Sequence, residues 1–110
     1  MATSGCSAET TEPYALRVMG DSMSPEFDDG HIIIVDPAVP LSHEAYAVID
    51  YSGEILFGQY RVDEGRQWLC YLNPDHESVE LISKFDVKGV VIQRSTGRRK
   101  ELKHYEYSTN

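Results

Sequence analysis

The chain contains 110 residues with a mass of 12.4 kDa, which is the size of one ordinary domain. Apolar residues make up 41% of it, and the frequent Tyr, Val and Ile exclude a disordered chain and favour a strand-rich globule. The formal net charge of -8 disfavours direct binding of DNA or RNA by this chain, because an acidic surface repels a polyphosphate.

The net negative charge is concentrated in the first half of the chain, because that half contains almost no bases. Residues 1–50 hold nine of the 18 carboxylates and a single base, Arg17. The bases near the C-terminus, which include Arg94, are expected to form a solvated hairpin. Cys6 and Cys70 lie too far apart to indicate a disulfide framework. The longest purely apolar run, residues 32–35, is too short for a membrane span, and no targeting segment precedes it, so we expect a cytoplasmic protein without membrane contact.

Taken in chain order, the sequence predicts a flexible leader over residues 1–12 and one domain over residues 13–110. Apolar runs separated by Gly, Pro, Asn and Asp predict the strands. These strands are expected at residues 14–18, 31–35, 45–51, 54–62, 67–72, 79–82, 87–94 and 102–107. The turns at residues 52–53 and 63–65 predict two consecutive hairpins. Since no segment shows a sustained helical period, we expect a mostly β fold, a compact bent-sheet or barrel-like domain.

The sequence contains no pattern typical of a metal or nucleotide site. The four histidines stand apart from one another and lack the ligand spacing that zinc favours. The glycines fall at turns or singly in strands, so no phosphate-binding loop is formed. We therefore expect neither a metal nor a cofactor.

Ser22 follows the first predicted strand, two residues after Gly20 and three before Pro25. A serine in such a loop is usually a turn former that caps backbone amides. The other interpretation is a nucleophile, and the surrounding sequence favours it.

This stretch closely resembles the nucleophile region of the S24 peptidases, the family that includes the C-terminal domains of LexA, of phage repressors and of UmuD-like proteins. The matching positions are Gly20, Ser22, Met23, Pro25, Asp29, Gly30, Val35 and Asp36-Pro37. The resemblance continues over residues 45–60, Leu72-Asn73-Pro74 and residues 85–92. It therefore implies a LexA-like fold for nearly the whole domain.

In that family a serine attacks a peptide carbonyl after a buried, neutral lysine has removed its proton. The resemblance makes Ser22 the nucleophile position, in a loop formed with Gly20, Asp21, Met23 and Pro25. It assigns the position of the general base to Gly58.

No other residue matches the base position of the family. Arg61 stays protonated, and Lys84 and Lys88 lie on a later element. His31 or His43 could act as a base only outside the family pattern. Loss of a general base removes about 10² to 10⁴ in rate. The glycine has a structural interpretation as well, a β-bulge or a close backbone approach, and both interpretations can hold together.

The sequence thus predicts a LexA-like domain without autoproteolytic activity that acts in dimerisation or partner binding. Neither an Ala-Gly or Cys-Gly bond nor an N-terminal helix-turn-helix is found in the chain. The edge strand at residues 102–107 is the expected surface of a homodimer. A partner docking near Ser22 is expected to be neutral or basic, because the loop with Ser22 belongs to the acidic first half of the chain. The alternatives are an active serine peptidase cutting in trans with a base outside the family pattern, and a fold relic in an unrelated binding protein.

Overall fold

The computed structural model describes residues 12–96 and 101–107, and these residues form eight strands and no helix. The strands are β1 (Tyr14–Arg17), β2 (Ile32–Asp36), β3 (Tyr46–Tyr51), β4 (Glu54–Asp63), β5 (Arg66–Cys70), β6 (Val79–Glu80), β7 (Phe85–Ser95) and β8 (Leu102–His104). All pairings are antiparallel, in one sheet of order β1-β2-β7-β3-β4-β5-β6 with β8 paired to β7. The mostly β fold predicted from the sequence is confirmed, and no helix that could cross a membrane occurs in the described part.

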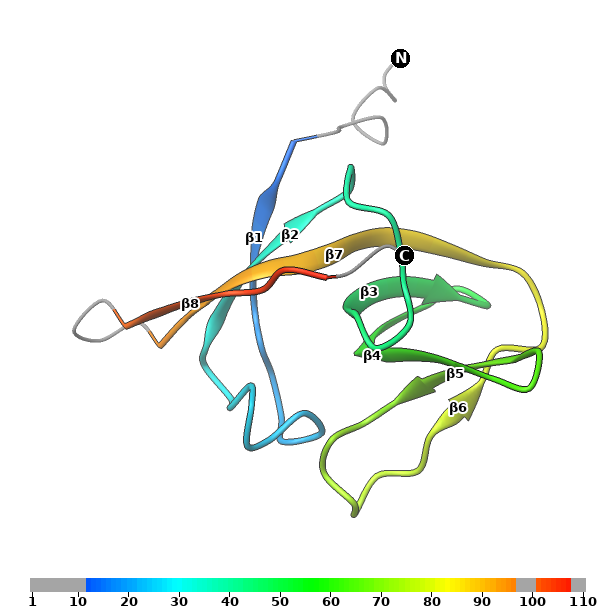
Figure 1. The fold of residues 1–110 in the computed structure, drawn as a ribbon. Helices are drawn as coiled ribbons and strands as arrows, with labels where there is room; N and C mark the ends of the chain where they lie inside the picture. Colours follow the sequence, from blue (N-terminus) through cyan, green and yellow to red (C-terminus); the bar gives the residue numbers. More distant parts are fainter. Residues whose placement is uncertain (1–11, 97–100, 108–110) are drawn as a thin grey trace.

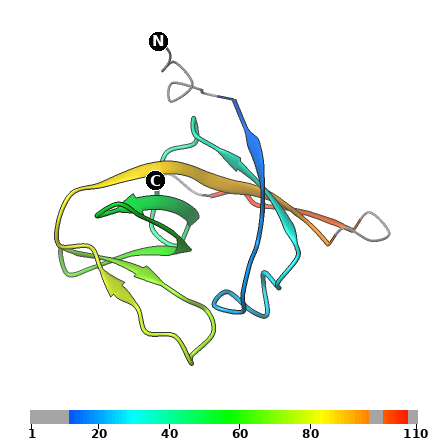
Figure 2. The ribbon, with the colours of Figure 1, turned by 180° about the vertical axis from the view of Figure 1, so that it is seen from behind.

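The long strand β7 joins the two parts of the sheet (Figure 1). Its first half, up to Val90, pairs with β3, while its second half, from Val90 onward, pairs with β2. The last residues of β7 also pair with β8. Seen from behind, β1 and β2 cross the second half of β7, and the β3–β6 part lies beside its first half (Figure 2). The sheet is therefore bent around β7.

Two register irregularities produce this bend. The pairing of β7 shifts against β2 between Ile34 and Val35, and against β3 between Val48 and Ile49. Gly89 lies between them, and a Cβ atom built there would come within 2.4 Å of Val35 Cγ1. Only a glycine, which has no Cβ atom, allows β2 to approach β7 so closely. Register shifts of this kind increase the local twist and bend of a strand.

The two predicted hairpins are confirmed. Ser52-Gly53 joins β3 to β4, and Glu64-Gly65 joins β4 to β5. All four turn residues have a positive φ, between 51° and 85°. Positive φ at both central residues is typical of the type I′ turn, whose twist matches that of paired strands.

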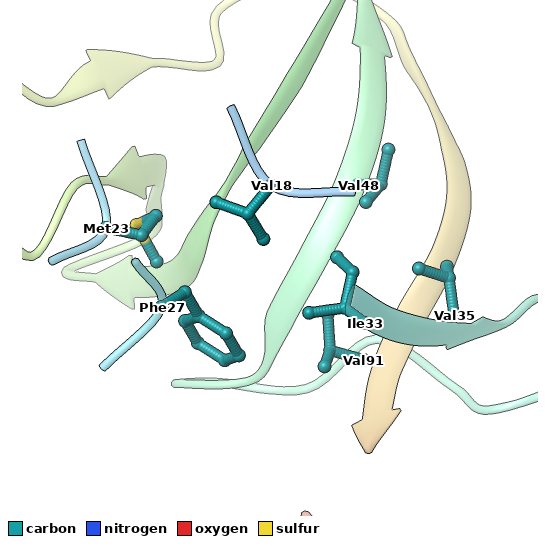
Figure 3. Packing of buried hydrophobic residues seen from close by; sticks show 7 residues of the cluster. All are labelled: Val18, Met23, Phe27, Ile33, Val35, Val48 and Val91. Atoms are coloured by element: carbon teal, nitrogen blue, oxygen red, sulfur yellow. The ribbon is translucent and has the colours of Figure 1, made fainter. Parts of the chain in front are cut away.

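The core consists of two clusters. The first core cluster contains Val18, Met23, Phe27, Ile33, Val35, Val48 and Val91. The second core cluster contains Ala45, Ala47, Ile49, Tyr60, Leu69, Leu81 and Val90. In Figure 3 the first cluster unites side chains of β2, β3 and β7 with those of the loop that carries Met23 and Phe27. That loop is therefore part of the core.

The prediction of an edge strand over residues 102–107 is wrong at its C-terminal end, because β8 ends at His104. Beyond it the ring of Tyr105 packs on Phe27 with centroids 5.4 Å apart, and the Tyr107 hydroxyl donates to the Val91 carbonyl at 2.6 Å. Burial of these two rings turns the chain toward the core and away from an extended edge.

The other strand boundaries differ from prediction by one or two residues. The predicted strands at residues 67–72 and 79–82 end early, at Cys70 and Glu80. The apolar residues beyond these ends pack in the core without belonging to a strand; they are Tyr71, Leu72 and Leu81. Their apolar character reflects burial, and the prediction mistook it for strand structure. The leader at residues 1–12 falls, apart from Glu12, outside the described residues, as do Cys6, Arg98, Arg99 and Lys100.

Gly58 lies in the middle of β4, opposite Ala47 of β3 in an undisturbed register. A Cβ atom at position 58 would lie 2.8 Å from Leu69 Cγ and 2.9 Å from the Cys70 carbonyl oxygen. Real Cβ atoms essentially never approach other atoms this closely. Of the two structural interpretations of Gly58, the close backbone approach is confirmed and the bulge is wrong.

Gly58→Ala should lower the free energy of unfolding by about 1–3 kcal/mol, because an extra methyl group overfills a packed site. Urea unfolding followed by the fluorescence of Trp68 measures this change. Ala15→Ser at an exposed position of β1 is the control and should change stability by less than about 0.5 kcal/mol. Equal stability of Gly58→Ala and the parent chain would show that β4 and β5 are not packed as described.

Candidate functional site around Ser22

Ser22 lies in a loop between β1 and β2, here called the serine loop (residues 18–30). Two backbone hydrogen bonds of 2.8 Å close its base, from the Val18 amide to the His31 carbonyl and from the Gly30 amide to the Val18 carbonyl. Gly30 has a φ of 94°, a conformation that glycine adopts at little cost. The loop therefore begins and ends at one point of the sheet.

Two buried side chains anchor the serine loop to the core. Met23 is 1% exposed and Phe27 is fully buried, and the Phe27 amide donates to the Met23 carbonyl at 2.9 Å. The Phe27 ring meets Tyr46 edge to face at 4.9 Å and Phe57 at 5.2 Å. Figure 3 shows Met23 and Phe27 among the side chains of the first core cluster. Because Met23 is adjacent to Ser22, the burial of Met23 restricts where the serine can lie.

Short polar contacts shape the loop further. Gly20, with a φ of 86°, donates its amide to Asp29 Oδ1 at 2.7 Å. The Ser24 hydroxyl donates to Asp28 Oδ1 at 2.8 Å, and the Ser24-Pro25 peptide bond is cis. The structure thus provides local roles for Gly20, Asp29 and Pro25, which the sequence had singled out.

Asn73 connects the serine loop to the segment after β5. Its amide donates to the Ser22 carbonyl and its side-chain Nδ2 donates to the Asp21 carbonyl, both at 3.0 Å. Its Oδ1 accepts the Asp75 amide at 2.9 Å, which closes a turn. The sequence analysis noted Leu72-Asn73-Pro74 as part of a family pattern but did not assign Asn73 this positioning role.

His76 is the second residue near the serine loop that sequence analysis missed. Its Nε2 lies 2.9 Å from Asp21 Oδ1, and its ring packs edge to face against Tyr71 with centroids 6.1 Å apart. Asp21 and His76 are 55 residues apart in the chain. No sequence spacing could reveal the pair, because only the fold brings the two segments together.

Ser22 borders a hollow of about 480 Å³, here called the Ser22 hollow. Its lining residues are Leu16, Arg17, Val18, Met19, Ser22, Val48, Ile55, Leu56, Phe57 and Tyr71. The floor is apolar, and the rim carries Met19 and Ile55, whose side chains are 79% and 58% exposed. This mixture of an apolar floor and one hydroxyl is typical of a small binding site.

Among the described lining residues, only Arg17 and Tyr71 are ionisable. An arginine stays protonated at any relevant pH and therefore cannot accept a proton. Burial, followed by the charge of Glu54, raises the pKa of Tyr71, so this phenol also keeps its proton. The lining of the hollow supplies no general base for Ser22.

The other base candidates are not among the residues that line the Ser22 hollow. The missing side chain of Gly58 faces Leu69 and Cys70, and Gly58 does not line the Ser22 hollow. The Nδ1 atoms of His31 and His43 accept the amides of Asp28 and Val62, each at 3.0 Å, and neither ring lines the hollow. The described residues contain no group of three His, Cys, Asp or Glu side chains that could hold a metal ion.

Glu26 connects the serine loop to the C-terminal part of the chain. Its Oε2 accepts hydrogen bonds from Lys103 Nζ at 2.6 Å and from the Tyr105 hydroxyl at 2.7 Å. Arg94 Nη1 donates to the Glu26 carbonyl and lies 3.5 Å from its Oε2. Burial raises the pKa of Glu26, but the hydrogen bonds from Lys103 and Tyr105 and the charges of Lys103 and Arg94 outweigh this effect and hold the pKa below its usual value.

Comparison with known proteins agrees with this geometry. The Peptidase S24-like family matches residues 2–92. The chain is 34% identical over 94 residues to the prophage repressor CohE of Escherichia coli K12, covering 82% of this chain and 42% of that protein. It is 32% identical over 96 residues to the repressor protein C2 of Salmonella phage P22, covering 82% and 43%. The chain thus spans less than half the length of these two repressors.

The chain belongs to the Peptidase S24-like family. Within that family it is a LexA-like domain of the repressor type, as its similarity to two phage-derived repressors indicates. The resemblance inferred from the Ser22 region is confirmed.

Glu26→Gln should reduce the loss of stability in acid. A carboxyl group whose pKa is lower in the folded chain stabilises the fold above its unfolded pKa of about 4.3, and this contribution is lost as pH falls through the lower, folded value. The parent chain should therefore lose stability below about pH 4.3 more steeply than Glu26→Gln in urea titrations at each pH. Glu77→Gln, an exposed control, should keep the parent slope. Equal slopes for Glu26→Gln and the parent would contradict the assigned contacts.

Proposed function

We propose that this chain is the LexA-like domain of a phage-type or SOS-type repressor or regulator, that it lacks autoproteolytic activity, and that it acts by binding a second copy of itself or a protein partner. The observation that carries the proposal is the lining of the Ser22 hollow, in which the ionisable groups are Arg17 and Tyr71. The two repressor relatives support the regulatory setting.

The lack of a general base in the described lining of the Ser22 hollow supports an inactive serine over a nucleophile. A serine hydroxyl attacks a carbonyl efficiently only when a neighbouring group takes its proton, and a general base contributes about 10² to 10⁴ in rate. The resemblance assigns the family lysine to position 58, where Gly58 leaves no side chain. A side chain at position 58 would meet Leu69 and the Cys70 carbonyl, so a lysine there would require β4 and β5 to separate.

Pairing of two copies through β8 is the proposed mode of dimerisation. Among the described residues β8 pairs with β7 along one edge, and its three side chains are exposed. Leu102 in particular is 54% exposed. An exposed edge with unpaired backbone groups readily accepts a second strand, and two copies of β8 can pair symmetrically.

The charge of the chain supports a protein partner over a nucleic acid. With a net charge of -8, this domain leaves contact with DNA to another part of a repressor. We expect it to act in the cytoplasm, where a repressor meets its operator, without cofactor or metal.

An active serine peptidase that cuts in trans is the second candidate function. The pair formed by His76 and Asp21 favours it, because a histidine oriented by a carboxylate beside a serine is a recurrent catalytic arrangement. His76 is therefore the base to test, in place of His31 and His43. Against this candidate, His76 is not among the residues that line the Ser22 hollow.

A fluorophosphonate probe distinguishes the two candidates. We expect the purified chain to remain unlabelled, with the same background in Ser22→Ala, because an unactivated hydroxyl does not attack the phosphorus. An active serine hydrolase labelled in the same tube checks the reagent. Labelling of the parent chain that Ser22→Ala abolishes would overturn the proposal, and its loss in His76→Ala would identify the base.

Sedimentation equilibrium tests dimerisation. The parent chain should sediment as a dimer, and Leu102→Lys should raise the dissociation constant at least tenfold, because it places two ammonium groups at the shared edge. Ile82→Lys is the matched control, since Ile82 is 77% exposed and follows β6 at the far edge of the sheet. A chain that stays monomeric, or a Leu102→Lys variant that dimerises like the parent, would exclude the β8 interface.

A further inference from the structure

A second hollow, of about 400 Å³, lies on the β4–β5 hairpin and shares no lining residue with the Ser22 hollow. It is here called the Trp68 hollow. Its lining residues are His43, Arg61, Val62, Asp63, Trp68 and Cys70. Arg61 and Trp68 are direct cross-strand partners, so their side chains project from the same face of the hairpin.

A strained turn holds one wall of the Trp68 hollow. The Ala45 amide donates to the Ser42 carbonyl at 3.0 Å, which closes a turn with Glu44 at its third position and a φ of 73°. Glycine or asparagine normally occupies such a position. The Glu44 amide donates to the Tyr60 carbonyl at 2.6 Å, and its carbonyl accepts Gln59 Nε2 at 3.1 Å. Non-glycine residues in this conformation are concentrated at functional sites.

The turn presents a defined hydrogen-bond donor to the hollow. His43 Nδ1 accepts the Val62 amide at 3.0 Å, so a neutral His43 ring carries its proton on Nε2. Nε2 lies 3.8 Å from Glu44 Oε2, which is too far for a hydrogen bond. Within the described part of the chain, this N–H has no hydrogen-bond acceptor.

Arg61 adds further donors beside His43. Its Nη1 donates to Glu44 Oε2 at 3.1 Å and to Gln59 Oε1 at 3.4 Å. The contacts of the described residues leave Nε and Nη2 of this guanidinium available. A guanidinium presents its donors in a planar fork that suits two oxygens of one carboxylate.

Of the two carboxylates near the hollow, Glu44 pairs with Arg61, whereas Asp63 has no ion-pair partner among the described residues. Asp63 lies opposite Arg66 across the hairpin, but the Nε and Nη2 atoms of Arg66 donate to the two carboxylate oxygens of Glu80, each at 2.8 Å. The unused donors at the Trp68 hollow are therefore His43 Nε2 and the Nε and Nη2 atoms of Arg61, next to the indole ring of Trp68.

We propose that the Trp68 hollow binds a carboxylate attached to a flat apolar group. The carboxylate lies between His43 Nε2 and Arg61, and the apolar group packs against Trp68. A small aromatic acid and the C-terminal residue of a protein both carry this chemistry. The proposal does not depend on the state of Ser22.

The single tryptophan makes the test direct, since Trp68 provides the only indole cross-peak in a nitrogen–proton correlation spectrum. Benzoate should shift this cross-peak saturably, and benzamide, which has the same shape without the charge, should bind at least tenfold more weakly at equal ionic strength. Arg61→Gln and His43→Gln should each weaken benzoate binding at least threefold. Lys88→Gln, an exposed position of β7 outside the Trp68 hollow, is the matched control and should bind benzoate within twofold of the parent chain.

Glu44→Gln separates a binding role from a structural one. Removing this carboxylate frees Arg61, so benzoate should bind more tightly than to the parent chain, an outcome that loss of structure cannot produce. N-acetyl-glycyl-phenylalanine and its amide identify the source of the ligand. Tighter binding of this peptide acid than of benzoate assigns the hollow to a protein C-terminus, and the reverse assigns it to a small acid.

Three results would overturn the proposal. They are a Trp68 shift that grows linearly without saturation, equal binding of benzamide and benzoate, and unchanged binding in Arg61→Gln. The dispersion of the same spectra shows that each variant is folded. A loss of binding in Lys88→Gln as large as that in Arg61→Gln would equally contradict the assignment, because it would indicate a general effect of positive charge.

Discussion

The pairing of β7 on both of its edges is the constraint on which the rest of the structure depends. Backbone amides and carbonyls of a buried strand must find hydrogen-bond partners, and β7 finds them in β2, β3 and β8 at once. The register shifts on each side of Gly89, and such shifts bend a sheet. The bend creates the two core clusters and brings the serine loop over the first of them.

The serine loop owes its position to burial more than to its own sequence. Met23 and Phe27 insert into the first core cluster. Asn73 donates hydrogen bonds to the backbone carbonyls of the serine loop. Glu26 connects the same loop to Lys103 and Tyr105. A loop held from three directions keeps its geometry whether or not chemistry takes place there. The shape of the loop is therefore compatible with a domain that binds and does not cut.

Several charged residues form pairs that are close in space but far apart along the chain. Glu26 and Lys103 are 77 residues apart, and Asp21 and His76 are 55 apart. Both pairs join the serine loop to segments beyond β5. The two hollows differ in the chemistry of their linings. The Ser22 hollow has an apolar floor beside a hydroxyl, and the Trp68 hollow has unused hydrogen-bond donors beside an indole ring. They are two separate hollows of different chemistry on one small domain.

The sequence by itself determined the eight strands, the two hairpins and the family, because β-branched runs, turn residues and the Gly20–Ser22–Pro25 spacing are local signals. It also identified Ser22 and the glycine in the middle of β4. Only the tertiary structure decided that β8 ends at His104, since the burial of Tyr105 and Tyr107 overrides local strand preference. It alone placed Asn73 and His76 at the serine loop. Contacts between segments more than 50 residues apart leave no local pattern, because they depend on how the whole sheet bends.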